Sequence, residues 1–159
     1  MNDHTRSPIV PSWVRIALLA LGLPNVLTGA WAVLSPQNWF DNFPGFDPRL
    51  VAAEPPYNAH LATDAGAGLL ASGLLLLAAA WLADGRSVRL GLVGYGAFAI
   101  PHAAWHTFNP SEALTTAEDV RNAGLLLFVA AATIGLYVVV SRNGEHDRSV
   151  GAQREGVPA

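Results

Sequence analysis

The stretch Ala65–Ala83, with the sequence AGAGLLASGLLLLAAAWLA, decides the fold of this chain. It contains no charged residue, and its one hydroxyl group belongs to Ser72. A helix needs about 20 mostly apolar residues to cross a hydrocarbon core about 30 Å thick. The stretch therefore predicts a transmembrane helix.

Three further stretches have the same character. Ile16–Leu34 and Ala123–Val140 are uncharged, and Leu90–Phe108 is apolar apart from two histidines and a few small hydroxyl or aromatic residues. We therefore expect an all-α integral membrane protein whose residues 1–142 form one domain, an antiparallel bundle of four transmembrane helices. The expected helices cover about residues 13–34, 58–83, 87–108 and 116–141.

The composition agrees with a membrane protein and excludes other classes. Of the 159 residues, 52% are hydrophobic and 13% are charged, whereas about 25% are charged in an ordinary soluble domain. A formal net charge of -3 without a basic cluster excludes a nucleic-acid partner held by phosphate contacts. The absence of cysteine excludes disulfides, iron–sulfur clusters, thiolate metal sites and covalent haem attachment. The lipid bilayer is therefore the partner that the composition predicts.

The arginines set the expected orientation, because cytoplasmic loops carry the excess of basic residues. Every basic residue is an arginine, and one side of the predicted bundle holds Arg6, Arg15, Arg86, Arg89, Arg142, Arg148 and Arg154. The other side holds only Arg49 and Arg121. We expect a multi-pass protein of a bacterial plasma membrane with both termini in the cytoplasm. As an alternative, the first helix is a secretory signal cleaved at the small-x-small pattern Ala30-Trp31-Ala32.

The connections between the predicted helices differ in length and composition. Ser35–Tyr57 is a long outer loop between the first and second helices, rich in proline and aromatic residues, and we expect an ordered flap on the outer membrane surface. Asp84–Ser87 is a tight turn, which makes the second and third helices antiparallel neighbours. We expect residues 143–159 to form a disordered cytoplasmic tail.

Small residues predict where the helices approach each other closely, because they let two backbones come together. The expected contact positions are Gly68, Ser72, Gly91, Gly94, Gly96, Ala131 and Gly135.

Ionisable side chains gather near the outer ends of three predicted helices. Pairs spaced i, i+4 lie on one helix face, and three such pairs occur: His60 with Asp64, His102 with His106, and Glu118 with Asn122. Counting residues from the inner boundary places all three within about two turns of the outer boundary. Ionisable residues inside a bundle are costly and are functional by default. We expect the pairs to converge on one site, with Asn25, Thr28 and Tyr95 as candidates for its deeper lining.

Imidazole and carboxylate together are the ligand chemistry of a divalent transition metal such as Zn, Fe, Cu or Mn. The expected metal ligands are His60, Asp64, His102, His106 and Glu118. Asp64 or Asp119 would act as the catalytic base on a lipophilic substrate that enters from the outer leaflet beneath the flap. The first hypothesis is therefore a metal-dependent membrane enzyme.

Other interpretations of the same residues stay open. A histidine beside Asp64 forms an acid–base pair or proton relay without any metal. Thr115–Asp119 has the pattern of a capping box, and Asp64 could pair with Arg121, which would make these groups structural. The second functional class is a non-enzymatic membrane module, either an accessory subunit of a quinone-linked redox complex or a protein that binds a small ligand or ion. The sequence does not decide whether the protein is an enzyme.

The motifs Phe43-Pro44-Gly45, Tyr57-Asn58-x-His60-Leu61-x-x-Asp64-x-Gly66-Ala67 and Pro101-His102-x-x-x-His106 carry a family resemblance. They resemble a group of small actinobacterial four-helix membrane proteins over residues 13–140, and the two histidine motifs are the most specific part. More distantly, the layout is similar to that of DoxX-like four-helix proteins, some of which are linked to quinone-coupled redox chemistry. The resemblance implies a membrane bundle and transfers no catalytic residue to this chain.

Overall fold

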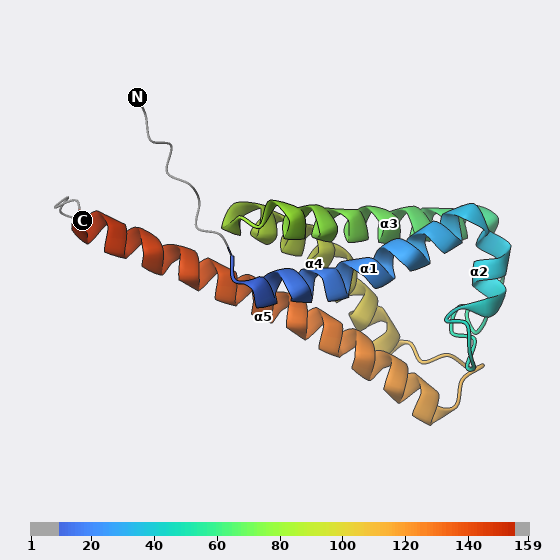
Figure 1. Ribbon diagram of the computed structural model, residues 1–159. Coiled ribbons are helices and arrows are strands. Elements are labelled where there is room, and N and C mark those ends of the chain that lie inside the picture. The colour runs from blue at the N-terminus through green and yellow to red at the C-terminus, as the bar shows by residue number, and fades with distance from the viewer. Residues whose placement is uncertain (1–9, 155–159) are drawn as a thin grey trace.

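The structure, a computed structural model, describes residues 10–154, with side chains as far as Gly144. Within this range the chain is all-helical and has no strand, so the predicted fold class is confirmed at that level (Figure 1). The five helices are α1 (Ser12–Leu34), α2 (Pro36–Asn42), α3 (Ala59–Leu82), α4 (Gly85–Phe108) and α5 (Thr116–Arg154).

Three of these helices are long and apolar enough to cross a membrane, judged by length and composition. They are α1, α3 and the Thr116–Gly144 part of α5. Helix α4 has 24 residues, as many as α3, but it carries Arg86 and Arg89 in its first turns and two histidines near its end. The described part of the chain therefore has three candidate membrane spans and a fourth helix, α4, that is as long as α3 and has a lower hydropathy.

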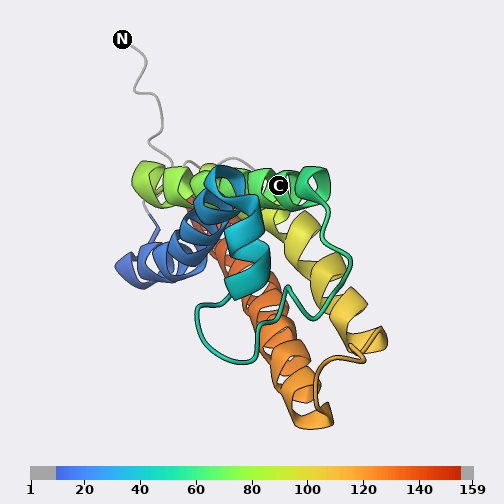
Figure 2. The same cartoon turned by 90° about the vertical axis from the view of Figure 1, so that its right-hand side faces the viewer.

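The long helices pack in the order α1, α3, α4, α5, and α1 and α5 do not pack closely against each other. A buried cluster including Leu18, Leu76 and Leu92 holds the four helices together at the end where α1 begins. Towards α2, the α1–α3 pair separates from the α4–α5 pair (Figure 1). Seen from that end, α2 and the segment after it lie in front of the space between the pairs (Figure 2). The four long helices are therefore packed together at one end, and α2 with the segment after it covers the space between the two pairs at the other end.

Helices α1 and α3 approach so closely that their contact requires glycine. A Cβ atom on Gly29 would collide with the backbone of Leu70, and a Cβ atom on Gly73 would lie 2.7 Å from the backbone nitrogen of Val26. The sequence did not single out these two glycines. The expected contact at Gly68 and Gly135 is wrong, since a Cβ atom at either position would meet nothing within 4 Å.

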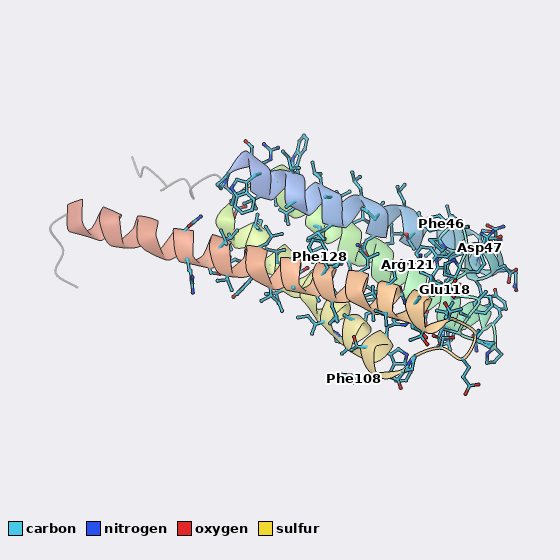
Figure 3. The ribbon with its side chains drawn as sticks, turned by 90° about the horizontal axis from the view of Figure 1, so that it is seen from below. Phe46, Asp47, Phe108, Glu118, Arg121 and Phe128 are labelled. Atoms are coloured by element: carbon cyan, nitrogen blue, oxygen red, sulfur yellow. The ribbon has the colours of Figure 1, made fainter. Side chains whose placement is uncertain are left out.

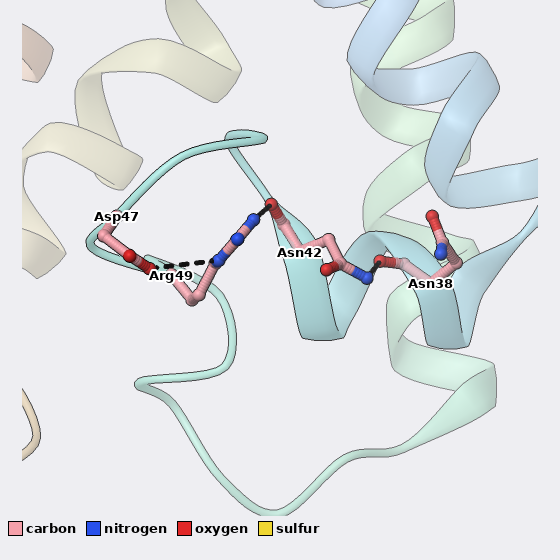
Figure 4. A network of polar contacts seen from close by, with 4 residues as sticks. All are labelled: Asn38, Asn42, Asp47 and Arg49. Carbon is pink, nitrogen blue, oxygen red and sulfur yellow. Dashed lines mark hydrogen bonds and ion pairs between the residues drawn. The ribbon is translucent and has the colours of Figure 1, made fainter.

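The long segment between α1 and α3 is ordered, and it contains a short helix that the sequence did not predict. Pro36 occupies the first helical position of α2, where its missing N–H costs nothing. Trp39 is 7% exposed and packs with Ala32 of α1 and Ala62 of α3. After α2, Arg49 Nη1 donates to the carbonyl oxygen of Asn42 at 2.9 Å, and its Nε lies 3.2 Å from Asp47 Oδ1 (Figure 4). These contacts fix the segment in place. We refer to residues 35–58 as the flap.

Helix α5 is longer than the sequence predicted. It continues to Arg154, beyond the expected end near residue 141, and residues 155–159 lie outside the described range. Disorder of the tail from residue 143 stays a prediction. No proline interrupts residues 116–154, and a single helical glycine such as Gly144 costs only about 1 kcal/mol. The polar composition after residue 142 was therefore a weak reason to end the helix.

Candidate functional site

A large cavity occupies the space where the two helix pairs separate beneath the flap. Its volume is about 830 Å³, within the range of about 300–1,000 Å³ that is usual for small-molecule sites. Most of its lining is apolar, with contributions from the flap and from four helices. Large apolar residues in the lining are Trp39, Phe43, Phe46, Leu50, Val51, Leu69, Phe98, Leu125, Leu126 and Val129.

Polar side chains enter the lining at two levels. The level nearer the flap contains Glu54, His106, Glu118, Arg121 and Asn122, and the deeper level contains Asn25, Thr28 and Tyr95. Along α4, the 11 positions from His106 to Tyr95 correspond to about 16 Å of helical rise. The cavity therefore has a polar mouth, a small polar group at depth, and a middle that is apolar apart from the His102 imidazole.

His102 and His106 lie side by side on α4, and both line the cavity. Their ring centroids are 4.8 Å apart with the planes nearly perpendicular, and the His102 ring stacks on Phe98 at 5.2 Å. The prediction that these two histidines share one inward face is confirmed. Their imidazoles offer the cavity two hydrogen-bonding or metal-binding groups on adjacent turns.

The deep polar group joins α1 to α4. Asn25 Nδ2 donates to the carbonyl oxygen of Leu21 at 2.8 Å and to the hydroxyl oxygen of Tyr95 at 3.3 Å. Tyr95 is 4% exposed, and among the described residues no acceptor takes its hydroxyl proton. As expected, Asn25 and Tyr95 form part of the deeper lining. The Tyr95 hydroxyl is a free donor at the cavity floor.

Glu118 and Asp119, the two acidic residues at the beginning of α5, form hydrogen bonds with the segment that precedes this helix. The backbone nitrogen and the Oγ1 of Thr115 lie 2.8 and 2.7 Å from Glu118 Oε2, and the Glu118 nitrogen lies 3.4 Å from Thr115 Oγ1. This is the capping box that the sequence predicted. Asp119 Oδ1 accepts a hydrogen bond from the Ser111 nitrogen at 3.3 Å, and Ser111 Oγ donates to the flap carbonyl of Ala53 at 2.6 Å. Both acids therefore have structural partners.

His60 and Asp64 lie outside the cavity. Their side chains are 82% and 61% exposed, and they pair with each other at 3.4 Å. The reason is the rotation of α3, which turns Ala62 and Gly66 towards α1 and leaves His60 on the outer face. The expected convergence of His60 and Asp64 with His102 and His106 is therefore wrong.

The structure thus separates the predicted metal ligands into two groups. His102, His106 and Glu118 line the cavity, whereas His60 and Asp64 do not. Among the described residues, no three His, Cys, Asp or Glu side chains are close enough to share one metal ion. Metal binding at the two cavity histidines stays a prediction.

Arg121 is a cavity residue that the sequence did not place in the predicted site, where it was expected only as a possible partner of Asp64. That ion pair is absent, and within the described part of the chain Arg121 forms no hydrogen bond or ion pair. Figure 3 shows Arg121 and Glu118 at the beginning of α5, at the same end of the molecule as Phe46 and Asp47. The sequence does contain a signal for Arg121, because this residue lies one turn after Glu118 on a helix that contributes to the predicted site.

No protein-family model, curated protein or solved structure matches the chain. The functional interpretation therefore depends on the geometry of the cavity.

Proposed function

We propose that this protein is a multi-pass membrane protein that binds a lipophilic small molecule in the cavity beneath the flap. The observation that carries this proposal is the cavity itself, about 830 Å³ in volume and lined mainly by apolar side chains with a few polar groups. Large apolar cavities with a few convergent polar groups are the usual form of a small-molecule site.

The proposal includes α4 as a fourth membrane span. Helices α3 and α5 are candidate spans, and α4 packs against both. The tight turn after α3 and the beginning of α5 lie at opposite ends of the molecule, so α4 carries the chain from one to the other (Figure 1). With both termini in the cytoplasm, the flap would lie at the outer surface. A reporter that is active only outside the cytoplasm, fused to the C-terminus, should then give no signal.

The bilayer is the expected source of the ligand. Residues of both α1 and α5 line the cavity, yet these helices do not pack closely against each other. A lipophilic molecule in the outer leaflet could therefore enter sideways between them without crossing water. This route also agrees with the flap, which covers the cavity from the end rather than from the side.

Two matched substitutions on α3 test the proposal. Both alanines are exposed, and Ala65 lines the cavity whereas Ala67 lies outside its lining. Ala65→Phe should fill part of the cavity and weaken binding of a fluorescent polyene lipid, supplied as the acid or as the methyl ester, by at least about tenfold. Ala67→Phe should leave binding unchanged. Equal binding by the parent and both variants would contradict the cavity as the site.

A metal-dependent enzyme is a second candidate, and the adjacent imidazoles of His102 and His106 favour it. A third ligand from Glu118 would require its carboxylate to move closer to the histidines, because among the described residues no three such side chains are close enough to share an ion. Metal analysis of detergent-purified protein tests this candidate. A metal-dependent enzyme requires a stoichiometric ion in the parent and loss of that ion in the His102→Ala variant. An ion-free parent would contradict this candidate.

A quinone would be one lipophilic ligand of the proposed kind, and the accessory-subunit hypothesis predicts it. Its carbonyl oxygens could accept hydrogen bonds from the cavity donors. Organic extraction of the purified protein, followed by mass spectrometry, would identify a bound quinone.

A further inference from the structure

We propose that the ligand is an anionic amphiphile, whose acidic headgroup binds Arg121 at the cavity mouth and whose hydrocarbon chain occupies the apolar middle. This inference rests on the proposed function and names the chemical class of the ligand.

The first step concerns the unpaired charge of Arg121. A guanidinium always carries its charge at neutral pH and presents five N–H donors in a planar fork that matches a carboxylate or phosphate. In the described part of the chain Arg121 lines the cavity and forms no hydrogen bond or ion pair, and its charge interacts with the Glu118 carboxylate only beyond ion-pair distance. The side chain is exposed at the mouth of the cavity, where its fork can form charge-assisted hydrogen bonds with an anionic ligand group.

The second step concerns the two carboxylates in the same lining. Glu118 has one oxygen bonded to both the nitrogen and the hydroxyl of Thr115, and it lies outside ion-pair distance of Arg121. Glu54 is an exposed flap residue and likewise forms no ion pair with Arg121. Neither carboxylate therefore occupies the fork of the guanidinium, and that position stays open for a ligand.

The third step is the direction of the lining along α5. After Arg121 and Asn122, the cavity residues on this helix are Leu125, Leu126 and Val129. The eight positions from Arg121 to Val129 correspond to about 12 Å of helical rise. A headgroup at Arg121 would thus be followed by an apolar path into the bundle. Asn122 and His106 lie at the same level and can donate further hydrogen bonds to the headgroup.

The shared chemistry is an acidic oxygen headgroup on a hydrocarbon chain, and it has two sources. One is the carboxylate of a free fatty acid, and the other is the phosphate of a single-chain phospholipid. Inorganic phosphate lacks the chain, so the cavity should not retain it.

The experiment compares a fluorescent polyene fatty acid with its methyl ester, on the full chain in nanodiscs of zwitterionic lipid. The parent should prefer the acid by about tenfold or more, because hydrogen bonds to a charged group contribute most to binding. Arg121→Gln should abolish the preference and Arg121→Lys should retain part of it, because lysine keeps the charge but loses the fork. The matched control is Arg142→Gln, an exposed arginine on the same helix and outside the cavity lining, which should keep the full preference.

Competition then separates the two headgroups. Displacement of the probe mainly by fatty acid supports a carboxylate ligand, and displacement mainly by lysophosphatidic acid supports a phosphate ligand. Displacement of the probe by inorganic phosphate alone would overturn the proposal that the ligand is an amphiphile. Equal binding of acid and ester by the parent, or a preference that survives Arg121→Gln, would overturn the anionic class and leave cavity binding intact. Probe binding that Ala65→Phe does not weaken would instead contradict the proposed function.

Discussion

Gly29→Ala should destabilise the protein by forcing α1 away from α3. The added methyl group would collide with the backbone of Leu70 and lie 2.7 Å from the carbonyl oxygen of Gly66. To reach an ordinary contact of 3.4 Å from that oxygen alone, the helices would have to separate by about 0.7 Å, and the nearer backbone nitrogen of Leu70 requires a larger separation. Backbone atoms cannot rotate aside as a flexible side chain can. Overpacking of this kind costs about 1–3 kcal/mol, which is roughly a 5- to 150-fold change in the unfolding equilibrium.

Thermal unfolding in a neutral detergent measures this effect, with the loss of monodisperse protein as the readout. Gly68→Ala on α3 is the matched control, because a Cβ atom there meets nothing within 4 Å. Its midpoint should stay the same or rise slightly, since alanine favours helix by up to about 1 kcal/mol over glycine. Equal midpoints for Gly29→Ala and Gly68→Ala would refute the close approach of α1 and α3.

Two further predictions concern the flap and the turn before α4. Trp39→Ala should release the flap while the long helices stay folded, because it removes the buried ring that packs α2 against α1 and α3. Trypsin should then cleave after Arg49 faster than in the parent. Unchanged cleavage would contradict this role of Trp39. Asp84 Oδ1 accepts hydrogen bonds from the nitrogens of Arg86 and Ser87 at 3.0 Å, and hydrogen bonds from Ser87 and then Arg86 lower the pKa of this carboxyl. Its stabilising effect should be complete above the unfolded-state pKa and be lost as the pH falls through the lower folded-state pKa. Asp84→Asn should remove that pH dependence while retaining the cap, whereas Asp84→Ala should cost about 1 kcal/mol near neutral pH.

The sequence predicted the helices well because their signals are local. Uncharged apolar runs locate α1 and α3, and the capping pattern of Thr115 and Glu118 locates the beginning of α5. The flap helix and the extension of α5 were missed, since weak polar or proline signals do not decide between helix and loop without knowledge of the surrounding contacts.

The site was predicted only in part, because helix rotation is not a local property. Spacing shows that His60 and Asp64 share one face of α3, but it does not show which neighbour that face meets. The rotation is set by Gly66 and Gly73, which allow α3 to approach α1 and leave His60 on the outside. On α4, the same kind of spacing puts His102 and His106 into the cavity. Two pairs with identical spacing therefore have opposite environments.

This difference also explains why the favoured chemistry changes from the sequence to the structure. With four His and Asp side chains at one point, a metal ion would have been the natural partner. With two imidazoles on one helix and a guanidinium without an ion pair one helix away, the cavity instead presents donors towards an apolar space, beside the carboxylates of Glu54 and Glu118 at its mouth. Donors around an apolar space suit a molecule with an acceptor at one end and a hydrocarbon chain at the other. The glycine contact that turns His60 outward and the open fork of Arg121 thus both support the proposal that the cavity binds a lipid-like ligand.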